Sequence, residues 1–200
     1  MVKLIAIVDE DFGIAKNGKI PWQFKDDLSF FQRQTWLDVV VMGRVTYFSI
    51  EKSLPSRINC IISNSMSSKE FFAKSNRSTK LFQTPEQALE KYQDHDIWII
   101  GGAMLFNYVI AGKLINKIII TQVHRSYNAD LFIDKSLLMD NFKFQRTIAR
   151  GLIQPELCTT PPSIVPTDTI ERENQFPKMA DDNLDTYSIY EYNLRISQPK

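Results

Sequence analysis

The feature that most constrains this chain is a series of short, almost wholly apolar segments, each followed by a turn or by polar residues. They are residues 2–8, 39–42, 58–62, 97–100 and 118–123. Unbroken apolar runs of this length are typical of strands that are covered on both faces. Helical patterns lie between most of them, and strands that alternate with helices form a largely parallel sheet. We therefore predict an α/β fold.

The remaining segments complete this prediction. Residues 26–35, 45–50, 85–92 and 103–110 are expected to be helices, with Thr84 as an N-cap and Pro85 at the first helical position. Residues 81–82 are expected to form a short strand, and residues 142–148 and 185–194 an antiparallel C-terminal edge. The expected architecture is one domain over residues 1–200, with a mostly parallel central β-sheet of about eight strands flanked by helices.

A long irregular segment interrupts the pattern near the end of the chain. Residues 149–184 hold most of the prolines and show little apolar periodicity. A loop of this length is uncommon inside a compact domain. Two interpretations stay open: a tolerated surface insertion, which is the usual character of such loops, or a segment that docks a partner or covers a site.

Charge and cysteine content narrow the possible partners. The net charge of +1 argues against nucleic acid as the main partner. Two cysteines without a CxxC pair and two histidines give no pattern typical of a metal site. The apolar run at residues 4–8 is too short for a signal peptide or a membrane span. We expect a cytoplasmic protein that binds neither metal nor membrane.

Two of the predicted strands end in glycine turns that suit a phosphate group. Gly101-Gly102-Ala103 follows one strand, and Gly43-Arg44-Val45-Thr46 follows another. Glycine lets the backbone approach a ligand closely, and N–H groups at a helix N-terminus bind anions. Arg44 and the Thr46 hydroxyl would add to the grip on a phosphate. Two such turns suggest a dinucleotide, with Ser63 and Asn64 near its adenosine phosphate, although each turn could also be a plain tight turn.

Asp27 is the candidate acid of the reaction site. Asp26 and Asp27 point about 100° apart on a helix, so they are not expected to act together. Leu28 and Phe31 are expected to face the core, with Asp27 at the edge of their stripe. The alternative interpretation is that such an acid only caps the helix.

These segments, in this order, resemble the dihydrofolate reductase family. The matching motifs are LIAIV at 4–8, Gly18-Lys19-Ile20-Pro21-Trp22, Asp27-Leu28 with Phe31, Thr35, VVMGRVTYFSI at 40–50, Leu54-Pro55-Ser56-Arg57 with Asn59, IIS at 61–63, IIGGAMLF at 99–106 and Thr121. Each motif is short, but their order and spacing over about residues 1–148 are specific. The resemblance implies hydride transfer from NADPH to C6 of 7,8-dihydrofolate, with protonation at N5, to give tetrahydrofolate.

The resemblance also implies a role for each matching position. Asp27 would bind the 2-amino group and N3 of the pterin, Thr121 would orient it, and Ile20 and Trp22 would lie on a mobile loop, residues 9–24. Arg57 would clamp a substrate carboxylate as a fork. The substrate would contact Ile5, Ile7, Asp27, Leu28, Phe31, Ile50, Leu54, Arg57, Ile100 and Thr121. The cofactor would contact Ala6, Ile7, Ile14, Ala15, Gly18, Gly43, Arg44, Val45, Thr46, Ser63, Asn64, Ile100, Gly101, Gly102, Ala103, Met104, Leu105 and Phe106. A non-proline cis peptide would join Gly101 to Gly102.

Some positions depart from the family pattern. Val45, Gln83 and Met104 stand where basic residues often surround the cofactor's 2′-phosphate, and Phe106 replaces a frequent tyrosine. The resemblance further implies dihydrofolate and antifolate-type small molecules as ligands, and a monomer.

Two other functions stay open. A reductase acting on a riboflavin-pathway pyrimidine would use the same phosphate turns, but it would need neither Asp27 nor Arg57. A non-enzymatic paralogue would bind folate or a protein through residues 149–184, and the intact candidate site argues against it.

Overall fold

The strands form one large sheet and one small one. The structure is a computed structural model, and it describes all residues except 23, 51, 68–70, 72–74, 154–184 and 196–200. The large sheet contains β1 (Val2–Val8), β3 (Val39–Gly43), β4 (Ile58–Ile62), β5 (Thr79–Phe82), β6 (Ile97–Gly101), β7 (Lys117–Val123), β9 (Phe142–Leu152) and β10 (Thr186–Leu194). The small sheet pairs β2 (Gly13–Ala15) with β8 (Leu131–Phe132).

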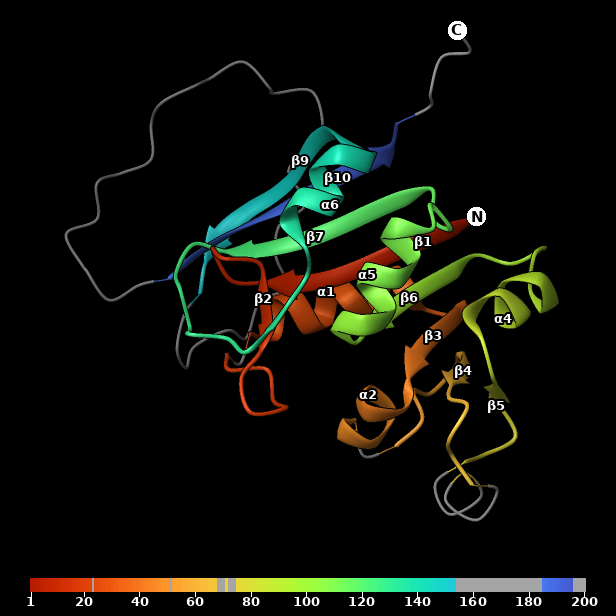
Figure 1. Ribbon diagram of the computed structural model, residues 1–200. Coiled ribbons are helices and arrows are strands. Elements are labelled where there is room, and N and C mark those ends of the chain that lie inside the picture. The colour runs from red at the N-terminus through yellow and green to blue at the C-terminus, as the bar shows by residue number, and fades with distance from the viewer. Residues whose placement is uncertain (23, 51, 68–70, 72–74, 154–184, 196–200) are drawn as a thin grey trace, which may run out of the picture.

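The order of the large sheet is β5-β4-β3-β6-β1-β7-β10-β9 (Figure 1). Neighbours from β5 to β7 are parallel, whereas β10 is antiparallel to both β7 and β9. This confirms the predicted mostly parallel sheet with an antiparallel C-terminal edge. Because the parallel strands point the same way, their carboxyl ends meet at one edge of the sheet, where ligands bind in folds of this type.

Helices cover both faces of the sheet. One face packs against α4 (Pro85–Lys91), α5 (Ala103–Ala111) and α6 (Lys135–Asn141), and we call it the α5 face. The other packs against α1 (Lys25–Thr35) and α2 (Arg44–Ser49), and we call it the α1 face. Figure 1 shows α5 and α6 on one side of the sheet and α1 on the other.

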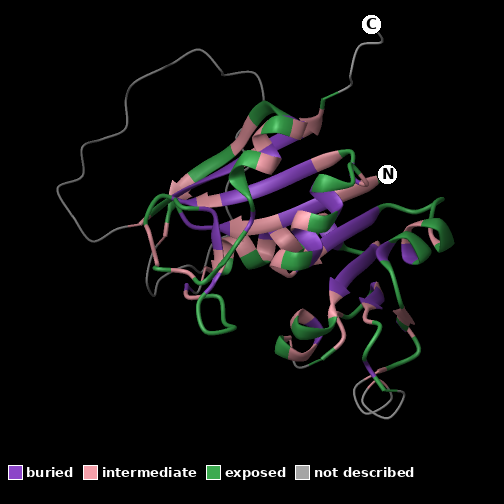
Figure 2. Ribbon diagram, viewed as in Figure 1, coloured by how far each residue is buried: buried purple, intermediate pink, exposed green. Residues whose placement is uncertain are grey.

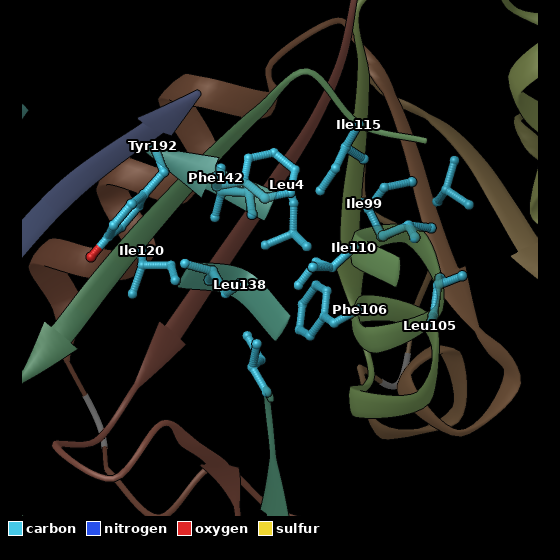
Figure 3. Packing of buried hydrophobic residues seen from close by; sticks show 14 of the residues in the cluster. Leu4, Ile99, Leu105, Phe106, Ile110, Ile115, Ile120, Leu138, Phe142 and Tyr192 are labelled. Carbon is cyan, nitrogen blue, oxygen red and sulfur yellow. The ribbon is translucent and has the colours of Figure 1, made fainter. Parts of the chain in front are cut away.

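The central strands supply most of the core. All four apolar residues of β3 and the Leu4 side chain of β1 are fully buried, and Figure 2 shows buried residues concentrated in the middle of the sheet. On the α5 face, Phe106 and Ile110 point from α5 toward Leu138 of α6 (Figure 3). Adjacent residues of a strand serve opposite faces, as when Val39 and Val41 pack on the α5 face and Val40 on the α1 face.

The helix that begins at Pro85 shows how local sequence sets an element boundary. Thr84 is its N-cap and forms a capping box with Gln87, as the Thr84-Pro85 pair indicates. This predicted start is confirmed.

The structure departs from the sequence prediction in three places. Helix α6 and the short strands β2 and β8 were not predicted, because the segments that form them are too short to show a clear period. Residues 149–152 belong to β9 and not to an insertion, because they pair with β10. Residues 154–184 of the insertion lie outside the described residues. No helix in the described part of the chain is long and apolar enough to cross a membrane.

Candidate active site

Helix α1 presents Asp27 on its buried stripe. Phe30 and Thr35 of this helix are buried, and Asp27, Phe31 and Gln34 are half-buried, which is the i, i+3, i+4, i+7, i+8 pattern of one helix face. The prediction that Leu28 faces the core is wrong, because its side chain is 54% exposed. The helix is rotated by about one residue from the expected orientation, so the carboxylate occupies the stripe itself. No side chain caps this helix, so the capping interpretation of Asp27 gains no support.

The Asp27 side chain is partly buried and has no counter-charge among the described residues. Burial raises its pKa from 3.8 to about 6, against a smaller lowering by the nearby Thr121 hydroxyl. Thr121 is fully buried on β7, opposite Ile7 of β1, yet its hydroxyl meets full hydrogen-bond geometry with no group of the described chain. No lysine or arginine among the described residues forms an ion pair with Asp27. The carboxylate therefore remains available to a ligand that donates hydrogen bonds.

The apolar residues predicted to wall the substrate cavity gather on the α1 face. Ile5 is buried there, and the partly buried Phe31, Ile50, Leu54 and Ile100 pack against the same cluster. Ile7 lies two residues after Ile5 on β1, so it faces the same side, and it is half-buried. Leu28, which is exposed, could join this wall only in contact with a ligand.

Arg57 is a buried cation, and only some of its guanidinium N–H groups donate hydrogen bonds to described residues. It is 5% exposed. Its Nε donates to the Pro55 carbonyl at 2.9 Å, and its Nη1 donates to the Thr35 hydroxyl at 2.9 Å. Its other guanidinium N–H groups have no acceptor, and no carboxylate pairs with it, within the described residues. Burial lowers its pKa, and two fixed hydrogen bonds hold a fork that suits an anionic ligand.

The two glycine turns meet. The structure has a cis peptide bond between Gly101 and Gly102, as the resemblance implied. A Cβ on Gly102 would lie 3.2 Å from Thr46 Oγ1, and a Cβ on Gly43 would lie 3.8 Å from the Gly101 carbonyl oxygen. Side chains at these positions would therefore fill the space between the turns. Arg44 is exposed and has no ion-pair partner in the described chain.

The other predicted cofactor positions differ in how accessible they are. Val45 and Met104 expose 69% and 90% of their surface beside the turns, and Asn64 is also exposed. Leu105 and Phe106 are instead buried, so α5 offers a ligand mainly its N-terminal residues. The remaining positions lie near the carboxyl ends of β1, β4 and β6 or on the first loop, and are Ala6, Ile14, Ala15, Gly18, Ser63, Ile100 and Ala103. The Ser63 hydroxyl accepts the Met66 N–H at 3.0 Å, so it also stabilises its own turn.

The loop between β1 and α1 carries two of the predicted site residues, of which one is buried and the other exposed. Trp22 is buried, and its indole N–H has no acceptor among the described residues. Ile20 is 58% exposed, although the resemblance implied that it faces the site. The loop is tied to the segment before β8, because Asn17 N–H donates to Asp130 at 2.6 Å and Asp130 N–H donates to the Ala15 carbonyl at 2.9 Å.

Sequence reasoning did not single out two residues that organise this loop. Asp9 is fully buried, and its carboxylate accepts the Gly13 N–H at 2.7 Å, the Asp11 N–H at 3.0 Å and the Tyr127 N–H at 3.2 Å. An aspartate that follows a strand and precedes a nearby glycine is a turn signal that could have identified Asp9. Tyr127 gives no such signal, because its partners are distant in sequence.

The site thus combines an isolated carboxylate, an apolar wall, a buried guanidinium and a double glycine turn. It contains no described lysine, histidine or cysteine in contact with Asp27 that could relay a proton. No group of three metal-ligating side chains occurs among the described residues. The arrangement can bind a flat heterocycle with adjacent N–H donors beside a phosphate-bearing ligand.

Comparison with known proteins identifies similar sequences. A family model described as dihydrofolate reductase matches residues 1–150. The dihydrofolate reductase of Drosophila melanogaster is 31% identical over 140 residues, covering 64% of this chain and 76% of that protein. The one of Ureaplasma parvum serovar 3 is 34% identical over 152 residues, covering 71% and 93%. A segregation and condensation protein A of Mycoplasmoides gallisepticum is 31% identical over 147 residues, and the match spans only 24% of its length.

A solved structure has the same fold. A dihydrofolate reductase from Enterococcus faecalis, complexed with NADP(H) and RAB-propyl, superposes with a TM-score of 0.69 and covers 98% of this chain and 97% of its own. The sequences are 18% identical, so this likeness concerns the fold.

Proposed function

The chain belongs to the dihydrofolate reductase family, and from this premise we propose that the site around Asp27 carries out the NADPH-dependent reduction of dihydrofolate to tetrahydrofolate. The observation that carries this proposal is the buried carboxylate without a counter-charge. Such a group favours a ligand that brings its own adjacent N–H donors or a positive charge. The pterin ring of dihydrofolate has both an amino group and a ring N–H on one edge.

Asp27 orients the substrate. Its two oxygens accept two parallel hydrogen bonds, from the 2-amino group and from N3 of the pterin, which fixes the ring in its plane. The Thr121 hydroxyl, already close to the carboxylate, limits the rotation of its side chain. Ile5, Phe31 and Ile50 then hold the two faces of the ring and exclude water. Fixed distance and orientation lower the barrier to transfer because the reacting atoms no longer have to find one another.

The residues present fit NADPH. Gly43, Gly101 and Gly102 leave room between two turns that a Cβ would fill, and Thr46 Oγ1 lies at that place. Arg44 supplies an unpaired cation, and the exposed apolar Val45 and Met104 supply surface that a bound cofactor would cover. NADPH, when bound there, supplies the hydride that reaches C6 of the pterin. Because Val45, Gln83 and Met104 are neutral, Arg44 is the described residue of the glycine turns that would bind the 2′-phosphate by its charge.

The described residues offer no side chain that could donate a proton directly to N5, so we assign this proton to solvent. Asp27 holds the pterin by its other edge, so a water molecule, admitted when the loop over residues 9–24 moves, delivers the proton. The negative field of Asp27 favours a protonated pterin. A carboxyl whose pKa is about 6 is protonated in part just below neutral pH, which makes the rate dependent on pH in that range.

Arg57 supports dihydrofolate, rather than a pyrimidine of the riboflavin pathway, as the substrate. Its free N–H groups form a fork that matches the α-carboxylate of the glutamate tail of dihydrofolate. A pyrimidine substrate would need neither this cation nor Asp27. We include dihydrofolate and antifolate-type molecules as ligands, a monomer and a cytoplasmic location in the proposal. We also include one domain over residues 1–200. Size-exclusion chromatography tests the monomer.

The test is the oxidation of NADPH followed at 340 nm with dihydrofolate as the second substrate. We expect Asp27→Asn to lower kcat/KM by about 100-fold or more, which is the scale of a group that assists proton transfer. Asp26→Asn removes the neighbouring carboxylate from the same helical turn and is the matched control, which should retain most activity. A wild-type enzyme inactive on dihydrofolate, or an Asp27→Asn variant as active as the wild type, would contradict the proposal.

A further inference from the structure

The buried Trp22 packs against a residue far along the chain. Its ring contacts that of Tyr127 edge to face, with the centroids 5.0 Å apart at 62°. Ile20, two residues earlier on the same loop, is 58% exposed, so the loop backbone alone does not bury this stretch. The indole N–H of Trp22 is buried without an acceptor in the described chain. Because no hydrogen bond to a described residue fixes the direction of this N–H, the orientation of the indole depends on the side chains that pack against its ring.

Tyr127 is itself held at both ends. Its backbone N–H donates to the buried carboxylate of Asp9 at 3.2 Å. Its phenol donates a short hydrogen bond to Asp185. Arg125 pairs with Asp185 at 3.2 Å and lies over the Tyr127 ring at 5.8 Å from its centroid. Burial and the Asp185 carboxylate raise the pKa of Tyr127 to about 12, so its phenol stays protonated and remains a donor.

These contacts bring three parts of the chain together. Asp9 immediately follows β1, Tyr127 lies between β7 and β8, and Asp185 immediately precedes β10. An aromatic ring has only two side-chain torsions, so anchoring it at its backbone and at its hydroxyl leaves it little freedom. A ring fixed in this way can fix its neighbour by packing.

We propose that Tyr127, anchored by Asp9 and Asp185, is a positioning residue that sets the orientation of Trp22. The inference rests on the proposed function, because it assigns Tyr127 to the same reaction. Tyr127 does not touch the reacting atoms. Its effect passes through Trp22, and it therefore changes how well the bound substrate is aligned rather than how the carboxylate of Asp27 binds it.

The experiment reads the position of Trp22 directly. The chain contains three tryptophans, namely Trp22, Trp36 and Trp98, so labelling the full-length protein with 5-fluorotryptophan gives few fluorine NMR signals. Trp22→Phe identifies the signal of Trp22. Tyr127→Phe removes only the phenol oxygen and keeps the ring. Tyr190→Phe makes the same change on β10, away from Asp9 and Asp185, and is the matched control.

We expect Tyr127→Phe and Asp185→Ala each to shift or broaden the Trp22 signal, while those of Trp36 and Trp98 stay in place. Single-turnover hydride transfer should slow by roughly fivefold, the scale of a small misalignment, with little change in the KM for dihydrofolate. The double variant should show about the effect of one, because residues acting as one unit are not additive. Tyr190→Phe should match the wild type in all three measurements.

Three results would overturn the inference. An unchanged Trp22 signal in Tyr127→Phe would show that the phenol does not position the indole. Loss of stability with wild-type hydride transfer would reduce Tyr127 to a structural role. Independent, additive effects of the two variants would separate Tyr127 from Asp185. If the wild type did not reduce dihydrofolate, the proposed function would fail, while the NMR result would still show whether Tyr127 positions Trp22.

Discussion

Replacing Asp27 by asparagine is expected to stabilise the folded protein at neutral pH while removing most of its activity. The wild-type carboxylate has a pKa of about 6 in place of 3.8, because burial disfavours its charged form. At pH 7.5 the folded protein must hold this group ionised in a poorly solvated place. Asparagine keeps the size and carries no charge, so the unfavourable ionisation disappears.

The expected gain in stability of Asp27→Asn follows from the pKa of this carboxyl in the folded and the unfolded protein. At about 1.4 kcal/mol for each pKa unit, the difference between 3.8 and about 6 corresponds to about 3 kcal/mol. This is an upper value, because Asp27 is only half-buried and water that reaches the carboxylate stabilises its ionised form.

The gain in the free energy of unfolding that we expect from Asp27→Asn depends on pH. Between about pH 4 and pH 6 the folded state binds more protons at Asp27 than the unfolded state does. The contribution of this group to the free energy of unfolding therefore falls as pH rises through that range. Below about pH 4 both states are protonated, and this source of the gain in Asp27→Asn vanishes. Above about pH 6 the gain reaches its full value.

The assay is urea unfolding of both proteins at pH 4, 5.5 and 7.5, followed by circular dichroism. A gain of about 2 kcal/mol would raise the urea midpoint at pH 7.5 by about 1 M. Asp26→Asn should bring no gain, because a charge in the first turn of a helix is favoured by the helix dipole. If the Asp27→Asn midpoint were equal to or below that of the wild type at pH 7.5, or if its gain were the same at all three pH values, the reasoning about burial would be refuted.

Three further predictions concern the rate, the substrate tail and the first loop. With saturating NADPH, the wild-type rate of the chemical step should fall as pH rises through about 6, the pKa of Asp27, whereas the residual rate of Asp27→Asn should not; a flat wild-type profile would contradict the role of this acid. Arg57→Lys should raise the KM for dihydrofolate by roughly tenfold, because lysine lacks the fork, and should leave the KM of a pterin without a glutamate tail unchanged; equal changes for both would exclude a carboxylate clamp. Gly13→Ala would place a Cβ 2.2 Å from the Cβ of Ala129 and should lower the free energy of unfolding by about 1–3 kcal/mol; adding Ala129→Gly should restore much of it, and no rescue would refute the clash.

Apolar patterning located most strands because burial on both faces leaves an unbroken hydrophobic run. The runs at 39–42 and 58–62 correspond to β3 and β4 almost residue for residue. The start of α4 could also be predicted from the sequence, since Thr84, Pro85 and Gln87, which begin and cap the helix, lie within four positions of one another. A helix cap can be predicted from the sequence because the residues that form it lie close together in the chain.

The face of α1 that packs against the sheet could not be predicted from the sequence in the same way. Leu28 and Phe31 give a reasonable apolar stripe, but the helix turns Asp27 inward and leaves Leu28 exposed. A rotation of one residue, about 100°, depends on which surface the helix packs against. The sheet face that receives α1 is built from strands scattered over the whole chain, and the helix sequence does not contain that information.

Contacts between neighbouring residues were enough to predict most strands and helices, the two glycine turns and a pair of acids, Asp26 and Asp27, in the first turn of α1. The folded chain places Asp27 beside Thr121 with no ion-pair partner among the described residues, leaves N–H groups of Arg57 without an acceptor among them, and joins Trp22 to Asp185 through Tyr127. Those properties arise from contacts between segments far apart in the chain, and folding creates such proximity only when the whole sheet assembles.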